Sequence, residues 1–235
     1  MRVLQLLPEL KFGGVERGTV DLSEHLTKLG HQSAVVSAGG GLTEQLSNHG
    51  AKHFSLPIAK KNFLAIKQYK NLREIYREFK PDIIHVRSRF PAWINVLALK
   101  GLSSSKPIVI STFHGLYSKP FYSKSMSYAN DIIAISKTVQ EYVFKNYDVD
   151  HSRVHLIYRG CDIDEFNTSA PSEAWSNSWY KEFPQTSDKI LLTLPGRITG
   201  WKGIEDFLKL LSQLDQAKYH GLIPGPVNEN KKRYF

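Results

Sequence analysis

Short apolar runs alternate along most of this chain with longer segments in which hydrophobic residues recur every three or four positions. The short runs are typical of buried strands, and the longer period is typical of helices that present one apolar face. The pattern predicts strands at 3–7, 33–37, 53–56, 82–86, 108–112, 132–135, 154–158, 190–194 and 219–223. It predicts helices at 15–29, 42–49, 62–79, 92–99, 122–128, 138–147 and 203–214.

This alternation predicts an α/β fold in which helices flank a Rossmann-like parallel sheet. Gly30 follows the first predicted helix as a terminator. The helix at 62–79 is predicted to keep one apolar face, formed by Phe63, Ile66, Tyr69, Leu72, Ile75, Tyr76 and Phe79. The helix at 203–214 is predicted to do the same with Ile204, Phe207, Leu208 and Leu211.

The strand and helix rhythm is lost between Phe166 and Ser187, where Asn, Ser, Pro and aromatic residues predominate. We therefore expect an N-terminal Rossmann-like domain over 1–168, a linker with one short amphipathic helix over 169–187, and the beginning of a second Rossmann-like domain over 188–235. Two strands and one helix bury too little apolar surface to stand alone. We expect this second domain to be incomplete, unless it docks on the first domain or on a partner chain.

Composition narrows the class of protein. The chain is 41% hydrophobic and 23% charged, as soluble globular proteins are. No apolar run approaches the roughly 18 to 20 residues that cross a bilayer, and Pro8, Glu9 and Lys11 interrupt the opening run before a signal-peptide core could form. The single cysteine, Cys161, excludes an intrachain disulfide and fits a reducing compartment. We therefore expect a cytoplasmic protein.

The net charge of +9 favours phosphate-rich partners, which are nucleotide diphosphates, anionic lipid surfaces or nucleic acid. The basic residues are scattered over alternating elements and form no zinc-finger or RNA-recognition signature, so we do not expect nucleic acid as a partner. Peripheral contact with an anionic membrane stays open.

Two glycine-rich turns, each between a predicted strand and a predicted helix, are candidates for anion binding. Gly13 and Gly14 permit close backbone approach at a helix start, although a plain tight turn explains them equally well and the GxGxxG fingerprint is absent. In the second turn, Arg197 and Lys202 follow Gly196 just before a helix. Two cations converging on such a turn suit a diphosphate leaving group better than they suit an ordinary solvated surface.

Three further side chains follow strands that are predicted to end at the same edge of the sheet, where ligands bind in open parallel sheets. His114 follows the strand at 108–112, and a lone histidine there is more often structural than functional. Arg87 and Arg89 follow the strand at 82–86. Two guanidinium groups at this edge indicate either an anionic acceptor or a structural ion pair.

The strings GGVER, HVRSRFPAW, STFHG, DIIAISK, YRGCDIDEF and LPGRITGWKG occur in this order between positions 13 and 203. Together they resemble the family 4 glycosyltransferases of GT-B architecture, most closely the bacterial enzymes that build lipopolysaccharide core or related surface glycans. The resemblance implies transfer of a hexose or heptose from a nucleotide-diphosphate sugar to a glycan or lipid-linked acceptor, at the inner face of the cytoplasmic membrane. It also implies retention of the anomeric configuration, no essential metal and no cofactor besides the donor substrate.

The resemblance assigns the donor nucleotide mainly to the second domain and the acceptor mainly to the first. The donor-binding residues that it implies are Gly13, Gly14, Gly196, Arg197 and Lys202. The catalytic residues that the resemblance implies are Arg197 and Lys202, which would neutralise the departing diphosphate, and His114, which would lie near the transferred sugar. Its acceptor-binding residues are Glu16, Arg17, Arg87 and Arg89.

Two departures qualify the resemblance, Arg159 and a missing pair of glutamates, and two DxD strings need a separate interpretation. Arg159 stands where many relatives have Asn, which we interpret as a tolerated change. The strings DVD at 148–150 and DID at 162–164 mimic the metal-binding DxD of another glycosyltransferase architecture, and we interpret both as coincidence. The family's pair of donor-binding glutamates has no counterpart here, so we expect a C-terminally truncated enzyme whose 235 residues alone bind a sugar nucleotide weakly and turn over slowly or not at all.

Two alternatives belong to other functional classes. The first is an inactive remnant or binding subunit that keeps only acceptor or membrane binding. The second is a nucleotide-sugar epimerase or another Rossmann oxidoreductase, which the missing GxGxxG and the absence of a Tyr-x-x-x-Lys motif near a catalytic Ser disfavour.

Overall fold

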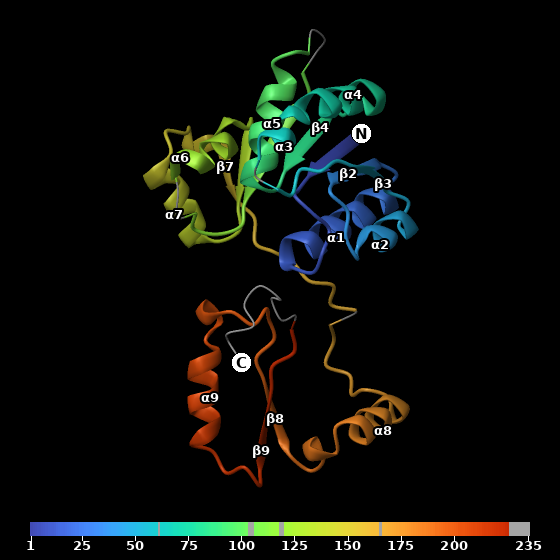
Figure 1. The fold of residues 1–235 in the computed structure, drawn as a ribbon, viewed down its shortest axis with the longest axis vertical. Coiled ribbons are helices and arrows are strands. Elements are labelled where there is room, and N and C mark those ends of the chain that lie inside the picture. The colour runs from blue at the N-terminus through green and yellow to red at the C-terminus, as the bar shows by residue number, and fades with distance from the viewer. Residues whose placement is uncertain (61, 103–105, 118–119, 165, 226–235) are drawn as a thin grey trace. The chain divides into compact units, whose positions relative to one another are not determined.

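The computed structural model describes residues 1–60, 62–102, 106–117, 120–164 and 166–225. It divides the chain into two units, Met1–Gly160 (unit 1) and Cys161–Phe235 (unit 2), shown in Figure 1. Unit 2 therefore includes the segment 169–187, for which the sequence predicted a linker. Each unit is described by itself.

Within the described residues, unit 1 is built on a seven-stranded sheet with the order β3-β2-β1-β4-β5-β6-β7. Every neighbouring pair is parallel, with Leu4 of β1 opposite Ala34 of β2 on one side and Ile84 of β4 on the other. This confirms the predicted Rossmann-like α/β fold. The strands are β1 (Arg2–Leu6), β2 (Gln32–Ser37), β3 (Lys52–Ser55), β4 (Ile83–Val86), β5 (Ile108–Phe113), β6 (Asp131–Ala134) and β7 (Val154–Leu156).

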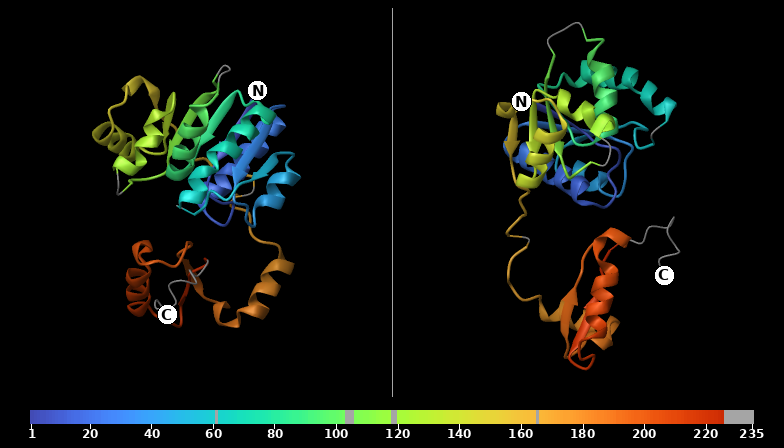
Figure 2. Two further views of the ribbon diagram at one scale, coloured as in Figure 1. Left: turned by 45° about the horizontal axis from the view of Figure 1, so that its top comes forward. Right: turned by 90° about the vertical axis from the view of Figure 1, so that its left-hand side faces the viewer.

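The helices that follow these strands pack on both faces of the sheet (Figure 2). Because alternate residues of a strand point to opposite faces, Ala34 and Val36 belong to one buried cluster and Val35 belongs to another. The first cluster packs under α4 and α5, and the second packs under α1 and α2. The helical elements are α1 (Gly14–Lys28), α2 (Thr43–Asn48), α3 (Phe63–Lys67), α4 (Tyr69–Phe79), α5 (Arg89–Leu99), α6 (Pro120–Ser123), η1 (Lys124–Tyr128), α7 (Lys137–Asn146) and η2 (His151–Arg153).

The predicted single helix at 62–79 is wrong, because the segment forms two helices that meet at Gln68. Asn62 caps α3 by accepting a hydrogen bond from the Ala65 amide at 2.8 Å, and the Gln68 amide donates to the Ala65 carbonyl, which tightens the last turn. This cap turns Ala65 inward and leaves Ile66 exposed, against the predicted face. The Phe63 side chain lies outside the described residues.

Helix starts and helix types also differ from the sequence prediction. α5 begins at Arg89 rather than at 92, since Pro91 falls in its first turn, where its missing amide costs no hydrogen bond. The segment predicted as one helix at 122–128 is divided between α6 and the 3₁₀ helix η1. Within the described residues, no helix is long and apolar enough to cross a bilayer.

A buried hydrogen bond between α4 and α5 provides a stability test. The hydroxyl of Tyr76 donates to Oδ1 of Asn95 at 2.6 Å, and both residues are buried. Tyr76→Phe leaves that oxygen without its donor, so we expect the free energy of unfolding to fall by about 1–3 kcal/mol. Urea denaturation measures the loss, with Tyr158→Phe as the control because Tyr158 is exposed. An equally small loss in both variants would contradict a structural role for this bond.

Unit 2 contains a parallel pair of strands joined through a helix, the βαβ arrangement of a Rossmann-like domain. The strands are β8 (Ile190–Thr193) and β9 (Tyr219–Leu222), and α9 (Ile204–Ser212) connects them. On α9, Ile204 is buried as predicted, whereas Leu208 is 53% exposed. The remaining helical elements are α8 (Glu173–Glu182), η3 (Pro184–Thr186) and η4 (Gly200–Lys202).

The short helix predicted between Phe166 and Ser187 is α8, which is held by aromatic contacts. The ring of Trp179 stacks on Trp175 at a centroid distance of 5.5 Å and contacts Phe183 at 4.5 Å. Its indole nitrogen donates to the hydroxyl of the buried Thr186 at 3.0 Å. The three aromatic side chains therefore fix α8 onto the η3 turn.

Candidate functional site at the carboxyl edge of the sheet

The carboxyl ends of the parallel strands of unit 1 share one edge, which is where open α/β sheets bind ligands. Since β1 lies between β2 and β4, the loop after β1 lies next to the residue that follows β4. The loop carries Gly13 and Gly14, and the residue after β4 is Arg87. His114 follows β5, and Arg159 follows β7 on the same edge.

α1 begins at this edge without a side-chain cap. Its N-cap residue is Gly13, and the helix itself starts at Gly14. A Cβ atom added to Gly13 would collide with the carboxylate of Glu16, so that carboxylate folds back over the start of its own helix. A Cβ atom added to Gly14 would lie 2.8 Å from Nη1 of Arg159. Glycine at 14 therefore makes room for this guanidinium group, whose Nη2 donates to the Gly14 carbonyl.

Arg87 is only 7% exposed and lies against the same helix. Its Nη1 donates to Oε1 of Gln5 at 3.1 Å, and Gln5 in turn donates to the Thr19 carbonyl and to the Ser23 hydroxyl. Among the described residues, Nε of Arg87 has no hydrogen-bond partner. Burial, followed by the charge of Arg159, lowers the pKa of Arg87 to about 10. The group is still charged at neutral pH.

His114 lies beside the two arginines as a neutral imidazole. Both ring nitrogens are buried, and neither has a hydrogen-bond partner within the described part of the chain. Burial, with smaller contributions from Arg87 and Arg159, lowers the pKa of His114 to about 3. The neighbouring His85, whose Nε2 lies 2.7 Å from the Thr112 hydroxyl, also has a pKa well below its ordinary value, chiefly because of burial.

The low pKa of His114 makes stability depend on pH in a defined direction. In the unfolded chain its pKa rises from about 3 to the ordinary 6.5, so the unfolded state binds more protons between these values. The stability that the neutral His114 contributes is therefore fully present above pH 6.5, and it is lost as the pH drops toward 3. From pH 7 to pH 5, we expect His114 to account for about 2 kcal/mol of the lost free energy of unfolding.

His114→Gln tests this expectation, because glutamine does not titrate. The free energy of unfolding is measured by urea denaturation at pH 7 and at pH 5. Between these values it should fall by about 2 kcal/mol less in the variant than in the wild-type chain. The exposed His155 provides the control variant, His155→Gln. If His114→Gln and His155→Gln change the pH difference equally, the burial of His114 does not have the effect described.

The other two predicted arginines contact other residues than Gly14, Gly18 and Gln5. The guanidinium group of Arg89 lies over the rings of Tyr117 at 4.6 Å and Tyr122 at 5.4 Å. Arg17 is paired with Asp21 one turn along α1, at 2.7 Å. Of the predicted residues of unit 1, Gly13, Gly14, Glu16, Arg87 and His114 are thus brought together.

Two residues of this cluster were missed by sequence reasoning. Arg159 was interpreted as a tolerated departure from the family, yet it contacts Gly14 and lies beside Gly18. Its position three residues after the end of β7 was the signal available, because that places it at the carboxyl edge. Gln5 is a fully buried polar side chain in the middle of β1, and a glutamine inside an apolar strand was the second signal.

In unit 2, the predicted cations lie on the connection between β8 and α9. Gly196 has φ 151° and Gly203 has φ 72°, which are values that favour glycine. The Gly196 amide donates to the Pro224 carbonyl at 3.0 Å, so the loops after β8 and β9 run together. Arg197 is exposed on this loop. The aliphatic part of Lys202 lies 4.0 Å from the position of a Cβ atom on Gly196.

The two DxD strings have local structural roles. The carboxylate of Asp150 accepts from the Ser152 amide, and that of Asp162 accepts from the Asp164 amide, each at 2.9 Å. Within the residues that the structure describes, His, Cys, Asp and Glu side chains do not gather in groups of three that could hold a metal ion.

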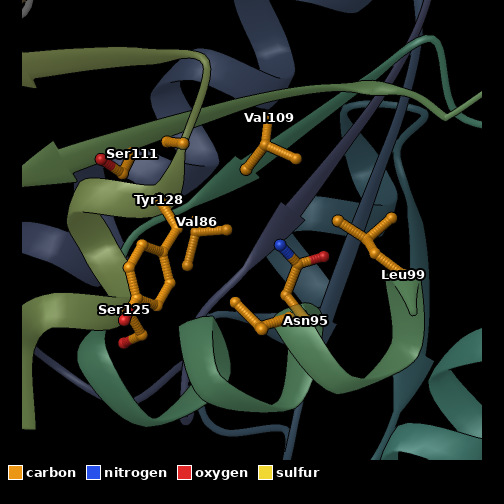
Figure 3. Close-up of a pocket in the computed structure, with 9 residues that line it drawn as sticks. Val86, Asn95, Leu99, Val109, Ser111, Ser125 and Tyr128 are labelled. Carbon is orange, nitrogen blue, oxygen red and sulfur yellow. The ribbon is translucent and has the colours of Figure 1, made fainter.

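Two cavities of unit 1 lie apart from the candidate residues. One, of about 40 Å³, lies between the sheet and α5 and η1, and Figure 3 shows side chains that line it, among them Val86, Asn95 and Tyr128. Its size is that of a site for water. The other, of about 690 Å³, lies at the amino edge of the sheet and is lined by Arg2 and Asp82, among others.

A parallel Rossmann-like sheet followed by a βαβ unit of a second domain is the arrangement of the GT-B glycosyltransferases whose structures are similar to this chain. The chain belongs to Glycosyltransferase Family 4, whose model matches residues 12–165.

Known proteins of this class are similar to most of the chain. The glycosyltransferase MJ1607 of Methanocaldococcus jannaschii is 24% identical over 219 residues, which are 86% of this chain and 56% of that one. The crystal structure of a glycosyltransferase from Rickettsia africae superposes with a TM-score of 0.81 at 29% identity, covering 99% of this chain and 62% of that one.

The HepE protein of Anabaena, crystallised with UDP and glucose, has a TM-score of 0.78 at 16% identity, covering 99% of this chain and 63% of that one. At this identity the likeness shows the fold alone. The chain spans less than two thirds of the length of each of these three proteins.

Proposed function

We propose that this protein transfers a sugar from a nucleotide-diphosphate sugar to a glycan or lipid-linked acceptor in the synthesis of lipopolysaccharide or another surface polysaccharide. The observation that carries the proposal is the cluster of Gly14, Arg87 and His114 at the carboxyl edge of the sheet of unit 1. The chain that forms this sheet belongs to Glycosyltransferase Family 4. The chain does not need a metal ion in this proposal, and transfer retains the anomeric configuration.

The donor side is assigned to the two glycine-rich loops. Arg197 and Lys202, on the loop after β8, neutralise the charge that develops on the diphosphate as the sugar departs. Gly196 keeps that loop close to the one after β9. Gly13 and Gly14 present the start of α1, whose backbone amides and dipole favour an anion. The bound UDP and glucose of the similar HepE structure support this class of donor.

The acceptor side is assigned to unit 1, with Glu16, Arg17, Arg87 and Arg89 around it. His114 is neutral at physiological pH because its pKa is about 3, so it offers one donor and one acceptor nitrogen to sugar hydroxyl groups. Because its pKa is about 3, this side chain is a weak proton acceptor and does not serve as the general base. Its role in the proposal is to orient the transferred sugar.

The place of action in this proposal is the inner face of the cytoplasmic membrane. The net charge of +9 supports peripheral attraction to an anionic lipid surface. A lipid-linked acceptor would then be presented at the same surface.

A transfer assay tests the proposal. The purified protein is incubated with UDP-, GDP- and ADP-linked sugars and with lipopolysaccharide acceptors of decreasing length. We expect slow transfer of sugar to an acceptor by these 235 residues, an unchanged anomeric configuration in the product by NMR, and an unchanged rate after EDTA treatment. Inversion or a strict metal requirement would contradict the mechanism. If the protein binds the acceptor but neither binds the donor nor transfers sugar, the result would instead support an inactive binding subunit.

A further inference from the structure

Two guanidinium groups of unit 1, those of Arg87 and Arg159, approach one bare face of α1. A Cβ atom on Gly18 would lie 3.1 Å from Nη2 of Arg159 and 3.3 Å from Nη2 of Arg87. The protein groups that these arginines contact by hydrogen bonding are neutral, namely the Gly14 carbonyl and the Gln5 side chain. Within the described residues, neither arginine forms an ion pair.

The face of α1 beneath them is kept free of side chains. Gly14 and Gly18 are separated by four positions, so they lie one above the other on the helix. A methyl group at Gly14 would come within 2.8 Å of Arg159, and one at Gly18 within 3.1 Å. The two glycines therefore allow the guanidinium groups to lie directly against the first turns of α1.

The carboxylates near Arg87 compensate its charge only in part. Arg87 is 7% exposed, and burial and the like charge of Arg159 disfavour its charged form. Asp21 and Glu16 favour that form, yet the pKa of Arg87 is still lowered to about 10. Asp21 is also paired with Arg17, and the Glu16 carboxylate turns back toward Gly13. A buried cation beside a like charge costs free energy unless an anion offsets it.

We propose that Arg87 and Arg159, which lie against the face of α1 that Gly14 and Gly18 leave bare, form an oxyanion site in unit 1 that binds a phosphate or carboxylate group on the acceptor. Planar guanidinium forks are suited to bidentate contact with such groups. The assignment to the acceptor rests on the proposed function, in which the donor diphosphate is held by Arg197 and Lys202 of unit 2. Arg159 is then a specificity-determining residue that selects an anionic acceptor over a neutral one.

The first test is binding of inorganic phosphate and of a hexose 6-phosphate to the whole chain, measured by calorimetry. Arg159→Asn removes one fork from an exposed residue, so the fold is retained. We expect both ligands to bind about 10- to 100-fold more weakly, the value of a charge-assisted hydrogen bond. Lys145→Asn, which removes an exposed charge on α7, is the matched control and should change neither affinity.

A second variant keeps both charges and changes only the geometry. Gly14→Ala places a methyl group against Nη1 of Arg159, and we expect it to weaken phosphate binding as Arg159→Asn does. Gly160→Ala is its control, because a Cβ atom there meets nothing within 4 Å. Circular dichroism checks that all four variants are folded.

The outcomes separate this proposal from the proposed function. Phosphate affinity that is unchanged in Arg159→Asn, or absent in the wild-type chain, would overturn the oxyanion site. If Arg159→Asn weakens UDP binding but not hexose 6-phosphate binding, the anion belongs to the donor and the acceptor assignment is wrong. If sugar transfer is never observed while hexose 6-phosphate binding still depends on Arg159, the oxyanion site stands and the proposed function fails.

Discussion

Replacing Phe113 with alanine is expected to lower the free energy of unfolding by about 3–5 kcal/mol, the largest stability effect that we predict. Phe113 ends β5, is fully buried, and has its ring centroid 5.4 Å from those of both Tyr117 and Tyr147. The alanine variant leaves a cavity where strand, loop and α7 meet. Because His114 is the next residue, the same cavity also loosens the candidate site.

Urea denaturation of Phe113→Ala measures this effect. Phe121→Ala is the matched control, since Phe121 is 85% exposed and its loss should change stability by no more than about 0.5 kcal/mol. A loss below about 1 kcal/mol in Phe113→Ala would show that this aromatic cluster does not hold the carboxyl edge together.

Lys202→Met is expected to reduce sugar transfer at saturating donor by about 10²- to 10³-fold, which is the usual effect of removing one group that stabilises a developing charge. The side chain lies against Gly196 on the β8 to α9 loop, where the diphosphate is assigned. Methionine keeps most of the aliphatic packing and removes only the cation. The loss should appear in kcat, because the charge on the leaving group develops in the transition state.

Lys209→Met is the control for this variant. Lys209 is also exposed, but it lies on α9 itself rather than on the loop. Steady-state rates with varied donor concentration separate kcat from KM. Equal rates for Lys202→Met and Lys209→Met would remove Lys202 from the mechanism and leave the family membership of the chain unaffected.

The parallel sheet could be predicted from sequence because most of its strands contain a short apolar run and alternate with segments of helical period. The break at Gln68 could not, because the apolar spacing of 62–79 continues through it and the Asn62 cap decides the register of α3. The start of α5 was predicted at 92, whereas the helix begins at Arg89 and Pro91 lies in its first turn.

The candidate site was predictable where a residue directly follows a strand, as Arg87 and His114 do. Arg159 was missed because its partner Gly14 is 145 positions away and β7 is separated from β1 by β4, β5 and β6, so the contact depends on the course of the segment after β7. A local pattern carries no information about that course. The resemblance to the family marked Arg159 as a departure, but the contacts on α1 were needed to give it a physical meaning.

The claim that the carboxyl edges of the two sheets bind a sugar nucleotide is tested most directly by amide NMR of the ¹⁵N-labelled chain titrated with UDP-glucose and related donors. The account predicts that the amide signals of Gly13, Gly14 and Gly196 shift, while those of Arg2 and Asp82 at the opposite edge of unit 1 stay in place. Shifts confined to Arg2 and Asp82, or no shift with any nucleotide sugar, would contradict it.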